Sequence, residues 1–273
     1  MAISRFRKFL LIAACFALVV PMIVVPYVVT SREEGGKMLG AFQKYTRDIF
    51  RKENVELQTV TVKPEFQVIS YGKPFEYIRM VPSRSLAEKI STITSTDATL
   101  FGFMRMYTLF LTPKDGYNFP LFSLVVINRG GKRFFVLEII DPARISEEYI
   151  AQAYEKMKKL KETVQDLPDT PPPDNSRAKE MTMDFSIHTK ADNSREQFFL
   201  DLYDDYLSTY LKMVKNAPPL TDPEQNKKVQ EGVKAYVNAV LEQGGPAVNV
   251  FKFLLSPEQK REVVKTVLFG GGE

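Results

Sequence analysis

The chain has 273 residues, 44% of them hydrophobic, which is enough for one large or two small domains, and we expect one. Its 37 Lys and Arg against 33 Asp and Glu give a net charge of only +4, so no strongly basic surface suited to nucleic acid is expected. One cysteine, Cys15, and one histidine, His188, exclude an intrachain disulfide and argue against a cysteine- or histidine-based metal site.

Residues 9–29 form an apolar run of 21 residues without a charge, which is long enough to cross a bilayer core of about 30 Å as a helix. Arg5, Arg7 and Lys8 precede it. The positive-inside rule then predicts a single-pass membrane protein with its N-terminus on the cytoplasmic or matrix side. The soluble part, residues 32–273, would lie in the periplasm, intermembrane space or lumen, and residues 1–31 would be the anchor.

Two other interpretations of this segment stay open. A cleavable signal peptide shares the basic start, but its apolar region is usually about 7–15 residues long and ends at a small-x-small site. This run is longer and ends in Tyr-Val-Val-Thr-Ser. Ile12–Cys15 resembles a lipobox, but a mature lipoprotein would then begin with many further apolar residues. We therefore favour the uncleaved anchor.

The first part of the soluble chain predicts a helix and then a sheet. Apolar residues recur at helical spacing over 36–52, and the pattern changes over 57–80 to three short β-rich pieces separated by Lys-Pro and Gly-Lys-Pro. The segments LFGFMRMYTLFL, FPLFSLVVI and RFFVLEII then lie within 99–140, divided by turn sequences typical of hairpins. The middle segment is almost wholly apolar, which predicts a strand covered by helices on both faces.

The C-terminal half is predicted to be mainly helical. Helices are expected over 146–165 and 194–215, from residue 222 onward, and from residue 256 to the terminal glycines. A proline-rich loop and one more strand, MDFSIHT, lie between the first two. The chain is therefore expected to be an α/β protein, a three-layer α/β/α sandwich around a central antiparallel sheet, preceded by one transmembrane helix.

Residue patterns alone give little evidence of chemistry. No glycine-rich phosphate loop is present. Asp201 and Asp205 stand at i and i+4 spacing on a predicted helix, where a solvated polar face is the simpler interpretation. Histidine is a common acid–base residue, but a structural role is favoured over catalysis for His188 because no motif surrounds it.

Two blocks of the sequence resemble the ferredoxin-dependent bilin reductases. The first is LFLTPKDGYNFPLFSLVVINRGGKRFFVLEIIDP, and the second runs from FSIHTKADNSREQFFLDLYDDYL to the final KTVLFG. Pro113, Tyr117, Pro120, Phe122 and Asp141 in the first block match the family's run of an apolar strand, a turn and a second strand pair. The resemblance implies the same α/β/α sandwich, with a linear tetrapyrrole as ligand, electrons from ferredoxin, and neither flavin nor metal.

The family's proton-transfer residues have no ionisable counterpart at the corresponding positions. The strand acid falls at Val125, the histidine on the preceding strand at Thr108, and the upstream glutamate near Thr96. The Asn-Asp pair between the last two helices falls at Gly244-Gly245. Loss of one positioned acid or base typically costs about 10²- to 10⁴-fold in rate, so family chemistry is not expected.

The sequence thus predicts a membrane-anchored, non-catalytic protein of the bilin-reductase fold that is an accessory or binding subunit of a membrane complex. No cofactor is expected, and a tetrapyrrole is the candidate ligand. The alternative is a ferredoxin-dependent oxidoreductase that reduces CH-CH groups of a bilin, with Asp97, Asp141 and His188 as candidate catalytic residues and ferredoxin as partner. A periplasmic or lumenal solute-binding domain is a third hypothesis. The expected partners are the membrane, through residues 9–29, and a membrane protein complex.

Overall fold

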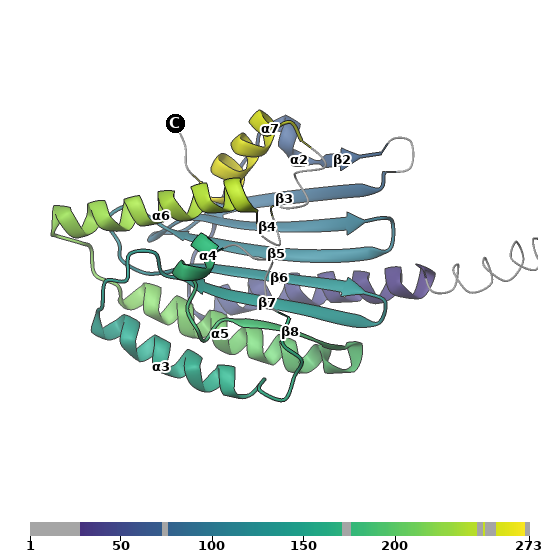
Figure 1. Cartoon of the computed structure of the whole chain (residues 1–273), viewed down its shortest axis with the longest axis horizontal. Helices are drawn as coiled ribbons and strands as arrows, with labels where there is room; N and C mark the ends of the chain where they lie inside the picture. The colour runs from purple at the N-terminus through teal and green to yellow at the C-terminus, as the bar shows by residue number, and fades with distance from the viewer. Residues whose placement is uncertain (1–27, 73–75, 171–175, 245–247, 249–254, 271–273) are drawn as a thin grey trace, which may run out of the picture.

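The computed structural model describes residues 28–72, 76–170, 176–244, 248 and 255–270 (Figure 1). Within them lies an eight-stranded antiparallel sheet with the order β1-β3-β4-β5-β6-β7-β8, in which β2 also pairs with β3. The strands are β1 (Gln58–Val60), β2 (Ile69–Tyr71), β3 (Ile78–Leu86), β4 (Ile90–Leu100), β5 (Met104–Pro113), β6 (Leu121–Arg129), β7 (Lys132–Ile140) and β8 (Ile187–Asp192).

Helices cover both faces of this sheet, so the expectation of helices on either side of an antiparallel sheet is confirmed (Figure 1). One face packs against the N-terminal helix, residues 28–52, and against α3 (Glu148–Glu162) and α5 (Glu196–Asn216). The short helix η1 (Asn193–Arg195) leads into α5. The other face packs against α6 (Pro223–Gln243), α7 (Pro257–Glu262) and the π-helical turn η3 (Val263–Leu268), with α2 (Pro64–Gln67) and α4 (Ser176–Met181) beside them.

Two apolar cores follow from the alternation of side chains along the strands. Tyr107, Leu124 and Phe135 point toward the N-terminal helix and α5, where the rings of Phe135 and Phe199 stack with centroids 4.8 Å apart. Their strand neighbours, such as Val125, point toward α6 and η3. Strand β6 is therefore buried on both faces, as its sequence predicted.

The sequence prediction was wrong for parts of the first half of the sheet. The segment LFGFMRMYTLFL is not one strand, because residues 101–103 form the turn between β4 and β5. Strand β4 was missed, since its sequence ISTITSTDATL is rich in Thr and Ser and carries little apolar signal. The piece FQVIS forms part of α2 and the start of β2, and the first helix, expected from residue 36, is already present at residue 28, the first described residue.

The helices whose predicted starts carry a capping side chain begin where the sequence predicted. The carboxylate of Asp222 accepts a hydrogen bond from the backbone N–H of Glu224 at the start of α6. Ser256 and Gln259 form a reciprocal capping box at the start of α7. Among the described residues no helix combines the length and hydropathy needed to cross a membrane. The predicted anchor, residues 9–29, lies outside the described residues except for its last two.

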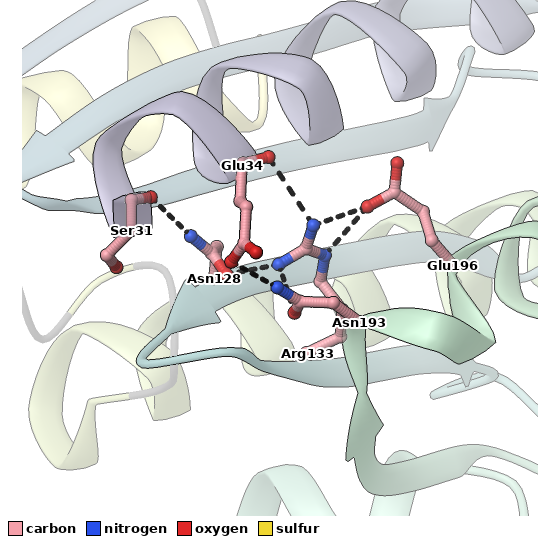
Figure 2. Close-up of polar contacts among 6 residues, drawn as sticks. All are labelled: Ser31, Glu34, Asn128, Arg133, Asn193 and Glu196. Carbon is pink, nitrogen blue, oxygen red and sulfur yellow. Dashed lines mark hydrogen bonds and ion pairs between the residues drawn. The ribbon is translucent and has the colours of Figure 1, made fainter. Parts of the chain in front are cut away.

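A buried polar network attaches the start of the N-terminal helix to the sheet (Figure 2). Arg133 on β7, whose side chain is only 3% exposed, forms an ion pair with Glu196 at the start of α5. It also donates to the side-chain oxygen of Asn193 at 2.6 Å. Asn128 on β6 donates at 2.7 Å to the backbone carbonyl of Ser31. These bonds fix the first turns of the helix against the β6–β7 hairpin and η1.

Candidate functional site

A single row of side chains crosses the sheet face beneath α6 and η3. The strand registers pair Thr96 with Thr108, Thr108 with Val125, Val125 with Val136, and Val136 with His188. Directly opposed residues of paired strands point to the same face. Thr96, Thr108 and Val125 are each no more than 2% exposed. The three strand positions that the resemblance pointed to are therefore neighbours on one buried face.

Threonine hydroxyls line the β4 part of this face. The hydroxyl of Thr94 donates to the backbone carbonyl of Val267 in η3 at 2.5 Å. The hydroxyl of Thr96, two residues along, is buried and has no hydrogen-bond partner. A buried polar group without a partner costs about 1–3 kcal/mol. The fold tolerates this cost at the β4 end of the row, which makes Thr96 a candidate ligand-binding residue.

Arg84 on β3 extends the same face, because it pairs in register with Thr94. Its Nη2 lies 3.4 Å from the hydroxyl of Thr92, and its buried Nε has no hydrogen-bond partner. Burial lowers the pKa of this guanidinium from its ordinary value. Gly270, the last described residue, lies against Thr92 and Arg84 with a left-handed φ of 66°, where a Cβ atom would collide with the threonine side chain. A guanidinium with free donors suits a carboxylate.

At the β7–β8 side of the face, His188 lies beside a carboxylate that the sequence analysis did not single out. Its Nε2 is 3.2 Å from Oε1 of Glu138 on β7, while its buried Nδ1 has no hydrogen-bond partner. Tyr236 on α6 is buried near Glu138, and burial, followed by the charge of Glu138, raises the pKa of the tyrosine well above its usual value. Glu138 is the one acid in the apolar segment RFFVLEII, and this feature of the sequence could have indicated a functional carboxylate.

The cover over the row is largely aromatic and aliphatic. Phe269 packs against Phe110 on β5 at 5.5 Å and meets the ring of Tyr236 edge-on at 5.9 Å between centroids. The buried side chains of η3, Val263, Val264, Val267 and Leu268, complete this layer. Gly244 ends α6 with φ 94°, and Gly245 lies outside the described residues. The site therefore combines an apolar lid with a few polar groups on the sheet, as small-molecule sites commonly do.

Asp97 lies on the opposite face of the sheet. Its carboxylate accepts a hydrogen bond from Nε2 of Gln43 in the N-terminal helix. Burial raises the pKa of Asp97, and the bond from Gln43 opposes that effect. Next to it, the hydroxyls of Thr46 and Tyr107 are 2.8 Å apart, and burial raises the pKa of Tyr107. Asp97 thus belongs to the contact with the N-terminal helix and is separated from the row by the sheet.

Asp141 occupies a third place, at the end of β7 beside α3. The hydroxyl of Tyr154 donates to its Oδ2 at 2.6 Å, and the backbone N–H of Arg144 donates to its Oδ1 at 2.8 Å. Burial, followed by the charge of Asp141, raises the pKa of Tyr154 far above its usual range. A shallow pocket of about 260 Å³ lies here, lined also by Lys158 and Met183. Asp97, Asp141 and His188 are therefore not brought together.

No grouping of three or more His, Cys, Asp or Glu suited to a metal ion occurs in the described part of the chain. Of the two helix acids considered above, Asp201 accepts a hydrogen bond from Gln197 at 2.7 Å and Asp205 is exposed, while the neighbouring Asp204 forms an ion pair with Lys52 at 2.9 Å. Their positions agree with a polar helix face.

Comparison with known proteins gives one family and one fold. A family model described as "Ferredoxin-dependent bilin reductase" matches residues 49–270. Among 35 matching chains of solved structures is phytochromobilin synthase from tomato in complex with biliverdin, with a TM-score of 0.70 and 17% sequence identity over 84% of this chain and 83% of that one. No curated protein sequence matches the chain. The N-terminal helix up to residue 48 precedes the region that the family model matches.

Proposed function

The chain belongs to the ferredoxin-dependent bilin reductase family, and on this premise we propose that it binds a bilin or related linear tetrapyrrole between the sheet and α6 without reducing it by the family's proton-transfer route. We further propose that residues 9–29 anchor it in a membrane, where it is an accessory or binding subunit of a membrane complex. The domain then lies on the side of the membrane opposite the N-terminus.

The non-catalytic part of the proposal rests on which residues occupy the row across the sheet. Thr96, Thr108 and Val125 are adjacent on three paired strands and buried. Neither an aliphatic side chain nor an alcohol of ordinary pKa can supply the acid and base that stepwise reduction of a tetrapyrrole requires at neutral pH. When several proton-transfer residues are replaced at once, we expect the family's reaction to be abolished and not merely slowed.

The same face retains features that suit binding of this ligand. A bilin carries lactam and pyrrole groups that exchange hydrogen bonds, and two propionate carboxylates. The buried hydroxyl of Thr96 and the free Nε of Arg84 are donors without partners. A guanidinium pairs well with a propionate, and a threonine hydroxyl with a lactam oxygen. Phe110 and Phe269 supply apolar and aromatic surface beside them.

One observation supports the alternative, a reductase with rearranged proton donors. Glu138 and His188 form a carboxylate–imidazole pair on the ligand face at 3.2 Å, with Tyr236 near Glu138. Such a pair is suited to acid–base chemistry. It lies at the β7–β8 side of the row, three strands from Thr96 at β4 and two from Thr108 at β5, so it would address a different part of the ligand.

The two functions separate in one experiment. The full chain, purified in detergent, is mixed with biliverdin, and absorption spectra are recorded before and after addition of reduced ferredoxin. We expect a shifted biliverdin spectrum on binding and no conversion afterwards. Conversion to a reduced bilin would overturn the non-catalytic proposal. Loss of that conversion in Glu138→Gln and His188→Gln, with Asp141→Asn as the control acid away from the face, would assign it to the pair.

The accessory role has its own test. Affinity purification of the full chain from detergent-solubilised membranes should recover stoichiometric membrane proteins with it. A chain that sediments alone after mild solubilisation, and binds no biliverdin, would leave neither part of the proposal standing.

A further inference from the structure

Three hairpin turns and the start of the N-terminal helix gather at one end of the sheet. The registers pair Tyr71 with Ile78, Ile78 with Leu100, and Arg129 with Lys132, so the β2–β3, β4–β5 and β6–β7 connections share this end (Figure 1). We call it the hairpin end. Its exposed side chains include Tyr71, Tyr77, Phe101, Arg129 and Lys132.

The N-terminal helix is attached rigidly at this end. The carbonyl of Ser31 accepts from Asn128, the residue before Arg129 in the β6–β7 hairpin (Figure 2). A Cβ atom on Gly35 would lie only 2.9 Å from the side-chain nitrogen of Asn128, so the helix backbone is nearly in contact with the strand. The hairpin tip and the first turns of the helix therefore lie at the same level.

Exposed aromatic side chains concentrate here. Tyr71, Tyr77 and Phe101 are 53%, 49% and 58% exposed, and they are the aromatic members among the exposed large hydrophobic side chains of the described residues. Val29, 49% exposed, is among the first described residues of the N-terminal helix, two residues before Ser31. An exposed cluster of this kind marks an interaction surface more often than scattered single residues do.

Phe101 is in a backbone conformation that the turn itself does not favour for phenylalanine. Its φ is 53° and that of Gly102 is 76°, so both central residues of the β4–β5 turn are left-handed. Asn, Asp or Gly normally occupies the first of these positions, because a Cβ branch to a bulky ring is disfavoured there. Neither turn geometry nor burial accounts for a phenylalanine at this tip, which indicates a role outside the fold.

Basic side chains accompany the aromatic ones. Arg32, Arg129 and Lys132 are exposed, and none of them has an ion-pair partner within the described part of the chain. The charge of Arg32 adds to burial in lowering the pKa of Arg105, so positive groups lie close together at the helix start. The exposed acids at this end include Glu33, Glu76 and Asp192, of which Asp192 stands opposite Lys132 in the β7–β8 register. Anionic lipid headgroups attract such cations.

The apolar run leads into this end without a linker. Residues 28 and 29, its last two, are already helical and continuous with the N-terminal helix. At 1.5 Å per helical residue, Ser31 is about 3 Å along the axis from Val29. If the membrane span ends at residue 29, the hairpin end must therefore lie next to the bilayer surface.

We propose that the hairpin end lies on the bilayer that residues 9–29 span, with Phe101, Tyr71 and Tyr77 in the interface and Arg129 and Lys132 on anionic headgroups. Aromatic belts at membrane interfaces follow the same physics. The inference rests on the anchor in the proposed function and adds the orientation of the domain.

The test uses the absence of tryptophan from the chain. Phe101→Trp makes one reporter at the hairpin end. Leu57→Trp is the matched control, because Leu57 is also exposed, at 41%, and precedes β1, whose Gln58 pairs with Leu86 at the other end of the sheet. Each full-length variant is reconstituted into phosphatidylcholine–phosphatidylglycerol vesicles, and its fluorescence is compared with and without brominated acyl chains.

We expect bromolipid to quench Phe101→Trp at least threefold more than Leu57→Trp, with a blue-shifted emission that reverts in part when Arg129→Glu and Lys132→Glu are added. Tyr71→Trp replaces Phe101→Trp if the latter does not fold. Equal, weak quenching at both ends in vesicles that carry the protein on flotation would overturn this inference alone. Protein that does not float with the vesicles would overturn the anchor and this inference together, while biliverdin absorbance of the same samples reports on ligand binding separately.

Discussion

The buried network at the start of the N-terminal helix gives the sharpest stability prediction. Arg133→Met keeps most of the side-chain volume but removes the guanidinium that pairs with Glu196 and donates to Asn193 and to the backbone carbonyl of Glu34. The glutamate would then stand beside β7 without its cation. The magnitude follows from how much of this pair water can reach.

Removing one partner of a buried ion pair typically costs about 3–5 kcal/mol. The Arg133 side chain is 3% exposed, but that of Glu196 is 24% exposed and regains some hydration, so we take the lower end, about 3 kcal/mol. For a domain of this size each kcal/mol lowers the melting temperature by about 2–4 °C. The expected fall is therefore roughly 6–12 °C.

The assay is thermal and urea unfolding of the full chain in detergent, followed by circular dichroism at 222 nm. Arg129→Met is the matched control, because this arginine lies four residues away in the same hairpin and is exposed; it should change the unfolding free energy by no more than about 0.5 kcal/mol. A loss below about 1 kcal/mol in Arg133→Met would refute the view that this network holds the helix on the sheet.

Three further predictions concern the two faces of the sheet. Thr96→Val removes the unpartnered hydroxyl, so it should raise the unfolding free energy of the ligand-free chain by about 1 kcal/mol while weakening biliverdin binding in a spectral titration; tighter binding would contradict the assigned role. Val125→Asp buries an acid beneath the apolar lid and should destabilise the chain by about 2 kcal/mol or more at pH 8 and less at pH 5, as urea unfolding would show. Because burial raises the pKa of Asp97 in the folded state, folded protein holds its proton more tightly, and that contribution to stability is lost as the pH rises through the raised pKa. Asp97→Asn should therefore raise the melting temperature at pH 7 and lose this advantage toward pH 4; an advantage that grows on acidification would be the contrary result.

Local sequence signals predicted the elements whose own residues determine them. The caps Asp222 and Ser256 fix the starts of α6 and α7 because their side chains bond to backbone N–H groups two or three residues away. The apolar β6 could be predicted in the same way. Strand β4 could not, because its threonines become buried only when η3 covers them, as the bond from Thr94 to Val267 illustrates.

The candidate site depends on register, which no local pattern contains. Asp97 and Thr96 are adjacent in sequence and lie on opposite faces of the sheet. Asp97 is the stronger candidate by residue type, but only the placement of the covering helices shows that Thr96 is on the ligand face and Asp97 is not. The pairing of Glu138 with His188 likewise requires the β7–β8 register, in which His188 stands opposite Val136. Sequence could supply the residue types but not the surface on which they meet.

The two proposals together set the height of the ligand site above the membrane. Thr96 is four residues from Leu100, the last residue of β4 at the hairpin end. At about 3.4 Å per strand residue the row lies roughly 14 Å from that end. The strands would then rise from the headgroups, and a bilin on the row would lie outside the bilayer and be open to exchange only with aqueous or membrane-peripheral partners. Any reductant for the alternative function must therefore be present on the same side as the domain, so transfer of electrons to bound biliverdin from a donor confined to the other side of sealed vesicles would contradict this arrangement.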